Sequence, residues 1–300
     1  MRKSNHHSKE LKKKKCFLCN SSKIFVLFKR DEYAMVKCRN CGLIYRLPQV
    51  NKKKYMEDIL KHYSQVDPFL KVAYSREKLY LRFLRQIQPI QVKNSRLLDI
   101  GCGVGYFLFL AKNNGWNVYG IESSPDLVKI GIRDYKLNIQ CTDYEESNFP
   151  SSYFDVATIW NVFDELSDPL KCILKIKITL KRDGLLYMRT PNAVFHLFTY
   201  RIHQTLKKLH FGHVIPYQSS IFHIFNFSKK TLKWIFSHNG FKNIKVKNSW
   251  LTSKDPYEVK KGVRIFKIVV FLITQCIFIL TLGKLTVAPS IEVFAENAKT

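Results

Sequence analysis

The stretch that most constrains the fold is Leu97–Gly105, which reads Leu-Leu-Asp-Ile-Gly-Cys-Gly-Val-Gly. Its apolar start predicts a buried strand. The three alternating glycines predict a tight turn in which the backbone can adopt positive φ and lie close to a ligand. Apolar residues then recur at helical spacing from Phe107 to Ala111, and Gly115 ends this pattern. The stretch therefore predicts a strand, a glycine turn and the start of a helix.

A second strand is predicted over Asn117–Glu122, and it ends in a carboxylate 17 residues after Gly105. A carboxylate in this place can accept hydrogen bonds from the two hydroxyls of a ribose. The spacing differs from the G-x-G-x-x-G of dinucleotide-binding folds, because the third glycine comes one residue early. A nucleoside site and an ordinary turn without a ligand are both compatible with this stretch alone.

Later segments follow the motif order of one known family. Gly-Cys-Gly-Val-Gly after Leu-Leu-Asp-Ile, followed by Glu122, resembles motif I and its sequel in the class I S-adenosylmethionine-dependent methyltransferases. Residues 154–160 resemble the fourth strand of that family, residues 161–169 resemble its "x-V-L-E-H-L-x-D-P" continuation, and residues 180–186 resemble its turn into strand five. The resemblance, which extends to ubiquinone-type methyltransferases, implies an α/β fold with a Rossmann-like seven-stranded sheet and helical insertions.

The same resemblance implies where the cofactor S-adenosylmethionine binds. Asp143 follows a short predicted strand over residues 137–141, where the family places an acid near the adenine amino group. The residues expected to bind the cofactor are Asp99, Gly101, Cys102, Gly103, Gly105, Glu122, Asp143, Tyr144, Trp160 and Asn161. In ubiquinone-type relatives, acids and a histidine after strand four can hold a divalent metal. Here that stretch offers Asn161, Asp164 and Glu165 without a histidine, so such a site is not expected.

Four of the eight cysteines form two C-x-x-C pairs separated by 18 residues. The members of the pairs are Cys16, Cys19, Cys38 and Cys41. This spacing predicts a structural zinc site with four thiolate ligands, and apolar residues 24–28 and 33–36 predict the hairpin of a zinc ribbon. Two disulfides are the alternative, which requires an oxidising compartment.

The expected domain organisation has four parts. Residues 1–15 form a basic tail, residues 16–48 the zinc ribbon, residues 49–93 a helical N-terminal lid, and residues 94–300 the methyltransferase domain. Two helices are expected within residues 52–88, with a break near Asp67 and Pro68. Residues 192–227 and 249–288 are expected to be insertions that cover the substrate.

A candidate catalytic residue follows the first insertion. Residues 223–228 resemble the "H-L-x-x-F-S" stretch of the family, after which Ser228 is expected to cap a helix that runs to about His238. His223 is the candidate general base, because a neutral imidazole can take a proton from an attacking hydroxyl near physiological pH. The alternative is a histidine that only fixes the loop by hydrogen bonds.

Residues 268–282 contain fifteen residues without a charge, flanked by Arg264, Lys267 and Lys284. As a helix this run is about 22 Å long, shorter than the hydrocarbon core of about 30 Å. Ser290–Ala295 is expected to be the seventh strand, returning beside a sixth strand over residues 241–247, so a membrane span is not expected. A buried helix of the substrate cover and a membrane-surface helix remain open alternatives.

The formal net charge of +27 is compatible with an anionic membrane or a nucleic acid, and equally with a compositional bias on solvated faces. Residues 1–15 lack the apolar region of a secretory signal, so a cytoplasmic protein is expected, with peripheral membrane attachment as the variant. We expect a methyltransferase that acts on a small molecule, namely a sugar, a glycan or a lipid-linked intermediate. The alternative is an RNA-binding ribbon protein with an accessory or RNA-directed methyltransferase domain.

Overall fold

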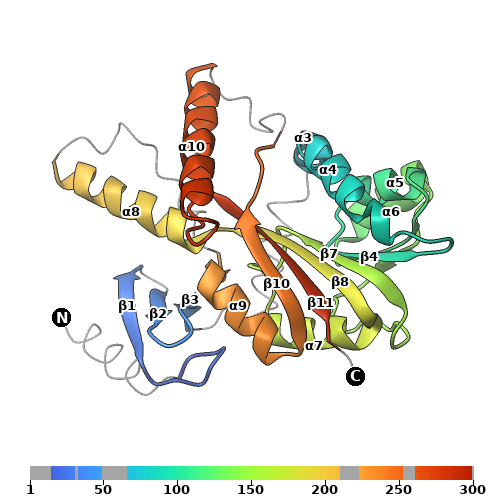
Figure 1. Ribbon diagram of the computed structural model, residues 1–300, viewed down its shortest axis with the longest axis horizontal. Coiled ribbons are helices and arrows are strands. Elements are labelled where there is room, and N and C mark those ends of the chain that lie inside the picture. Colours follow the sequence, from blue (N-terminus) through green and yellow to red (C-terminus); the bar gives the residue numbers. More distant parts are fainter. Residues whose placement is uncertain (1–14, 31–32, 49–65, 210–222, 253–260, 299–300) are drawn as a thin grey trace.

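The computed structural model describes residues 15–30, 33–48, 66–209, 223–252 and 261–298 (Figure 1). They contain a seven-stranded sheet with helices on both faces and a smaller four-stranded sheet beside it. Residues 1–14 of the predicted basic tail, residues 49–65 of the predicted lid, and residues 210–222 and 253–260 of the two predicted insertions lie outside the described residues.

The larger sheet has the strand order β10-β11-β8-β7-β4-β5-β6. Its strands are β4 (Arg96–Ile100), β5 (Asn117–Glu122), β6 (Ile139–Cys141), β7 (Phe154–Trp160), β8 (Leu180–Pro191), β10 (Phe241–Asn248) and β11 (Ser290–Asn297). The strands β8, β7, β4, β5 and β6 are neighbours in this order and run parallel to one another. In contrast, β11 is antiparallel to both β8 and β10. The carboxyl ends of the parallel strands therefore meet at one edge, where ligands bind in open α/β sheets. The predicted α/β fold with a seven-stranded sheet is confirmed.

Helices cover both faces of this sheet (Figure 1). One face carries α3 (Val66–Ser75), α4 (Glu77–Ile87), the short 3₁₀ helix η1 (Gln88–Ile90), α5 (Tyr106–Asn113) and α6 (Pro125–Tyr135). The other face carries α7 (Pro169–Thr179) and α9 (Lys229–His238). Successive side chains of each strand point to opposite faces of the sheet and so contribute to the hydrophobic core on each face. Leu97 packs with Phe83 and Phe107 on the first face, whereas its neighbour Leu98 belongs to the buried cluster on the second face.

The smaller sheet has the order β1-β2-β3-β9. Its first three strands are β1 (Ile24–Lys29), β2 (Ala34–Cys38) and β3 (Ile44–Leu47), and β9 (Phe225–Asn226) joins them from far along the chain. We call residues 15–48, without residues 31 and 32, the cysteine module. The predicted hairpin corresponds to β1 and β2. The sequence interpretation missed β3 and its pairing with β9.

Two further helices bear on the sequence interpretation. α3 begins at Val66, so Asp67 and Pro68 lie in its first turn, where a proline is tolerated because its missing N–H needs no partner. The break predicted near Asp67 and Pro68 lies at the border of the described residues and stays a prediction, whereas the interruption at Arg76 between α3 and α4 was not predicted. The first insertion begins with α8 (Ala193–Lys208), a helix that the sequence interpretation did not identify; its N-cap Asn192 accepts a hydrogen bond from the Val194 N–H at 3.1 Å.

Most of the apolar run lies in α10 (Lys261–Leu280), which projects from the body of the molecule (Figure 1). Large apolar side chains on and just after it are exposed, including Ile265, Phe266, Leu272, Ile279 and Leu282. The buried-helix alternative is therefore wrong for most of its length. Within the described part of the chain, no helix has the length and apolar character needed to cross a membrane.

Candidate functional site

The predicted glycine turn joins β4 to α5. Gly105 has φ +79°, and a Cβ there would lie 2.4 Å from a methyl carbon of Leu137, so a side chain at this position would clash with the core. Gly103 has φ +57°, and a Cβ there would meet nothing within 4 Å. Gly105 therefore serves packing, while Gly103 leaves the backbone open to a ligand.

Glu122, at the end of β5, is bonded to this turn. One of its carboxylate oxygens accepts from the Gly103 N–H at 2.9 Å, and the other accepts from the Ser124 N–H at 2.9 Å. Burial raises the pKa of Glu122, against the lowering effect of these backbone hydrogen bonds. The structure thus joins the predicted acid and the predicted turn at the carboxyl ends of adjacent strands.

Asp99 lies behind the turn on β4 and is buried. Burial raises its pKa to about 8; the hydrogen bond from the Thr158 hydroxyl, at 2.6 Å, acts in the opposite direction, and the charge of Glu122 adds to the rise. This carboxyl group is therefore largely protonated at neutral pH and connects β4 to β7.

The other predicted cofactor residues lie along the same edge of the sheet. Gly101 and Cys102 are half-buried in the turn, and Asp143 follows β6. Tyr144 and Trp160 are buried, Tyr144 in the core beside α7 and Trp160 among the rings of Tyr80, Phe83, Phe107 and Tyr187. Their side chains support the strand ends from the core.

A second cluster forms where β7 ends. Asp164 and Glu165 lie in the segment after β7, and His223, just before β9, hydrogen-bonds Glu165 through Nδ1. The same Nδ1 lies 3.4 Å from a carboxylate oxygen of Asp164. Asp164 is also held by the Thr190 hydroxyl at 3.2 Å, at the end of β8. We call Asp164, Glu165 and His223 the acid–histidine cluster.

This cluster corrects one expectation. Its three side chains offer ligand atoms within 4.8 Å of one another, a set that could hold a divalent cation. The histidine that residues 161–165 lack is thus contributed by a segment 58 residues further along. One-dimensional spacing could not reveal this pairing.

The electrostatics of His223 suit a proton-accepting group. Burial lowers its pKa, but the hydrogen bond to Glu165 and the negative charge of Asp164 outweigh burial and raise the pKa to about 8. Arg46, on β3, acts in the opposite direction. On α8, burial and then the charge of His223 lower the pKa of His196 to about 4, so this second histidine is neutral at physiological pH.

Sequence reasoning missed Arg189. It lies near the end of β8, is 7% exposed, and donates from Nη1 to the Asn161 side chain at 2.7 Å and from Nε to the Ser249 hydroxyl at 2.8 Å. Burial, followed by the nearby positive charge of Arg76, lowers its pKa to about 10. A buried cation beside a predicted cofactor residue can attract an anionic ligand. Its place within a strand gave no signal in the sequence.

The four predicted metal ligands converge in the cysteine module. The sulfurs of Cys16 and Cys41 lie 3.6 Å apart, as do those of Cys19 and Cys38, and all four cysteines are free thiols. A disulfide requires about 2.05 Å, whereas sulfurs around a tetrahedral zinc are separated by about 3.8 Å. The donor set and its geometry therefore fit a zinc ion and not two disulfides.

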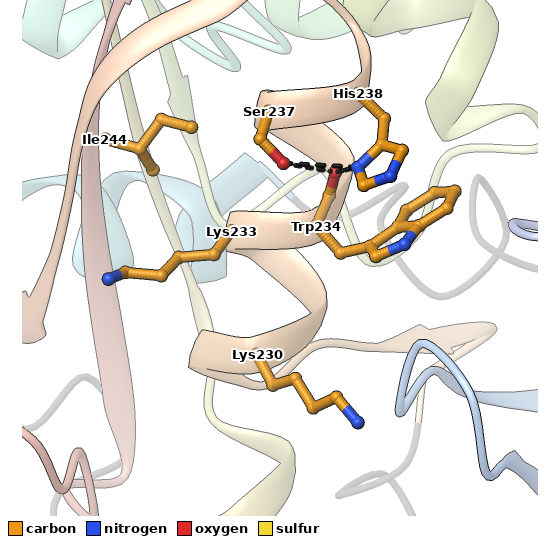
Figure 2. A pocket seen from close by; sticks show the side chains of 6 residues that line it. All are labelled: Lys230, Lys233, Trp234, Ser237, His238 and Ile244. Carbon is orange, nitrogen blue, oxygen red and sulfur yellow. Dashed lines mark hydrogen bonds between the residues drawn. The ribbon is translucent and has the colours of Figure 1, made fainter.

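Figure 2 shows an open depression on the outer side of α9, lined by α9 residues and by Ile244 of β10. Trp234 and His238 stack there with ring centroids 4.1 Å apart. The depression brings together two lysines but no acid, and its residues belong neither to the glycine turn nor to the acid–histidine cluster.

Comparison with known proteins agrees with the fold. Residues 72–246 match the family model described as a methyltransferase domain. The ubiquinone biosynthesis O-methyltransferase of Coxiella burnetii is 28% identical over 120 residues, which are 38% of this chain and 51% of that protein. The chain thus spans about half the length of these first curated relatives. The demethylmenaquinone methyltransferase of Staphylococcus saprophyticus is 26% identical over 221 residues, 66% of this chain and 92% of that protein.

Solved structures share the fold at lower identity. A SAM-dependent methyltransferase from Thermotoga maritima aligns with a TM-score of 0.50 and 18% sequence identity. The alignment covers 83% of this chain and 100% of that one. Phosphoethanolamine N-methyltransferase 2 of Haemonchus contortus aligns with a TM-score of 0.55 and 16% identity over 85% of this chain and 62% of that one. The matched domain covers more than half of the 300 residues. The chain therefore belongs to the methyltransferase domain family, within the class I S-adenosylmethionine-dependent methyltransferases.

Proposed function

We propose that this chain transfers a methyl group from S-adenosylmethionine to a small-molecule acceptor. The observation that carries the proposal is the hydrogen bond between Glu122 and the open Gly103 backbone, at the ligand-binding edge of a methyltransferase sheet. When bound, S-adenosylmethionine supplies a methyl group on a sulfonium, already activated for in-line attack by a nucleophile. The protein then has to hold the donor and the acceptor in the correct orientation for this attack and exclude water.

The glycine turn and strand ends supply the cofactor contacts. Glu122 would accept hydrogen bonds from the ribose, the open Gly103 lets the ligand approach the backbone, and Asp143 would lie near the adenine. Gly101 lets the turn pack closely, because a Cβ there would lie 2.6 Å from a methyl carbon of Val162. Asn161 lies at the end of β7, held by Arg189. Tyr144 and Trp160 act through the core that fixes these strand ends. Asp99 and Cys102 complete the predicted set, Asp99 from behind the turn.

His223 acts as the general base for an acceptor that must lose a proton. Its link to Glu165 orients the ring, leaving Nε2 for the acceptor. A pKa of about 8 keeps a useful fraction of the ring neutral at physiological pH. A divalent cation on the acid–histidine cluster is the competing role, and a methyl-transfer rate that depends on added Mg²⁺ or Mn²⁺ would support it.

A lipid-soluble or lipid-linked acceptor is the class that we favour over a free sugar. The exposed apolar side chains of α10, with Arg264 and Lys267 at its start and Lys284 beyond its end, support peripheral attachment to an anionic membrane surface from the cytoplasmic side. The names of the quinone-type relatives agree with an apolar acceptor. We also propose a structural zinc ion on the four cysteines, since four protein ligands leave no position open for water.

The test is methyl transfer from labelled S-adenosylmethionine into separated small-molecule, glycan, lipid and RNA fractions. We expect label in the lipid or apolar small-molecule fraction, lost with His223→Ala. Label confined to RNA would replace this proposal with the RNA-directed alternative. No transfer by folded protein that binds the cofactor would refute it.

A further inference from the structure

The segment that carries His223 is built into the cysteine module. The β3 and β9 strands pair in antiparallel fashion, with Ile44 opposite Asn226 and Tyr45 opposite Phe225. The Arg46 N–H adds a hydrogen bond to the Ile224 carbonyl at 3.1 Å. Residues about 180 positions apart thus share one small sheet, and the backbone next to His223 is an edge strand of that sheet.

The buried side chain of Asn226 strengthens this junction. Its amide nitrogen donates to the Ile44 carbonyl at 3.4 Å and to the His223 carbonyl at 3.1 Å. Its amide oxygen accepts from the His223 N–H at 3.3 Å. One side chain therefore connects β3 to both backbone groups of His223.

The other side of the segment contacts the catalytic edge. The Phe225 N–H donates to the Asp164 carbonyl at 3.1 Å, while the His223 ring bonds to Glu165. The segment from His223 to Asn226 thus lies between β3 and the acids that follow β7. A displacement of β3 changes the position of His223 relative to these acids.

The four thiols lie at the opposite end of the same connection. The chain passes from Cys41 to β3 in three residues, and the Cys38 N–H donates to the Leu43 carbonyl at 2.9 Å. Phe17, between two of the cysteines, contacts Phe225 with ring centroids 5.1 Å apart. The Thr231 hydroxyl donates to the Cys41 carbonyl at 3.2 Å, which ties the module to α9. Clustered thiolates need a cation to offset their repulsion, so their geometry depends on metal loading.

The glycine turn is held differently. Its backbone bonds run to β5, through the N–H groups of Gly101 and Cys102 to the Ile121 carbonyl at 2.8 and 3.0 Å, and Glu122 closes the turn. Loss of metal from the cysteine module leaves these bonds in place. Cofactor binding and histidine placement therefore rest on different hydrogen bonds.

We propose that metal loading of the cysteine module positions His223 for the acceptor step, through β3, Asn226 and β9, without setting the affinity for S-adenosylmethionine. The inference rests on the proposed roles of His223 and the four cysteines. Asn226 is in this scheme a positioning residue, because it acts through His223.

The test compares zinc-loaded protein, protein stripped with a chelator, stripped protein reloaded with zinc, and Asn226→Ala. Val26→Ala is the matched control, because Val26 lies on β1, which β2 and β3 separate from β9. The measurements are zinc content, calorimetric affinity for S-adenosylmethionine, hydrogen exchange of amides 223–227, and kcat for methyl transfer.

We expect unchanged cofactor affinity in every preparation. After zinc removal, hydrogen exchange of amides 223–227 should accelerate about tenfold or more, and kcat should fall about tenfold or more. Changes of this size are expected when a hydrogen-bonded support is lost. Reloading with zinc should restore the slow exchange and the original kcat. Asn226→Ala should show the faster exchange and the lower kcat while it retains zinc.

Exchange and kcat that stay unchanged without zinc would overturn the proposal. So would a parallel loss of cofactor affinity, which would indicate a global role in folding. If stripped protein precipitates, zinc-loaded Asn226→Ala decides: wild-type exchange in that variant refutes the coupling. Absence of methyl transfer in every preparation would refute the proposed function, while the exchange data would still test the coupling.

Discussion

The charge environment of His223 makes a prediction that needs no knowledge of the acceptor. Glu165→Gln keeps the size of the side chain and removes one of the two negative charges that raise the pKa of His223 to about 8. Asp164 continues to raise that pKa, while burial and Arg46 oppose it. We therefore expect the pKa of His223 to fall by about one pH unit, toward the ordinary value near 6.5, which corresponds to about 1.4 kcal/mol.

The sign follows from the form that accepts the proton. A base works when neutral, so the rate should rise about tenfold per pH unit below the pKa and level off above it. At pH 6.5 a group of pKa about 8 is about 3% neutral, whereas lowering that pKa to about 7 makes it about 24% neutral. The rising limb of the rate profile should thus shift to lower pH in Glu165→Gln. Its plateau should fall, because a weaker base accelerates less.

The measurement is an NMR titration of the His223 ring, followed by the rate profile once an acceptor is known. Glu145→Gln is the matched control, because Glu145 bonds to Ser167 at 2.7 Å and is not part of the acid–histidine cluster. A His223 pKa that is identical in wild type and Glu165→Gln would refute the electrostatic reasoning. Wild-type turnover by His223→Ala would exclude the base role.

Three further predictions concern the zinc site, the attachment of α10 to a membrane surface, and the glycine turn. Purified protein should carry about one zinc per chain, and Cys38→Ser should release it while cofactor affinity is kept; fully folded metal-free protein under reducing conditions would contradict a structural site. Acidic vesicles should sediment the protein at low salt, and Phe266→Asp should reduce this binding more than Lys242→Gln does; equal effects would show that α10 is not the contact. Gly105→Ala should destabilise the fold by about 1–3 kcal/mol through its clash with Leu137, whereas Gly103→Ala should mainly weaken cofactor binding; equal melting temperatures for wild type and Gly105→Ala would contradict this.

Local patterns predicted most of the larger sheet. The local pattern located β5 to the residue, and the family resemblance located β7 to the residue. Ser228 caps α9 as expected, with its hydroxyl accepting from the Thr231 N–H at 3.3 Å. These features depend on neighbouring residues, which the sequence displays directly. The return of β11 beside β10 was likewise anticipated from one short apolar strand near the C-terminus, whereas its position between β10 and β8 was not.

Long-range pairings escaped prediction. The contacts of His223 with Glu165, of β3 with β9 and of Arg189 with Asn161 join segments that carry no shared signal in the sequence. The exposure of α10 was undecided for a related reason, because an apolar run is compatible with both a core and a membrane surface.

The most direct test of the central claim is calorimetric titration of S-adenosylmethionine into wild type, Glu122→Ala and the control Glu296→Ala. Glu296 is a half-buried acid that bonds to Asn243, away from the glycine turn. Removing the ribose partner should weaken binding by about 1–3 kcal/mol, or about 5- to 150-fold, with the folded state verified by its melting curve. The control should bind as wild type does. Unchanged affinity in folded Glu122→Ala would contradict the assignment of this strand-end site to the cofactor.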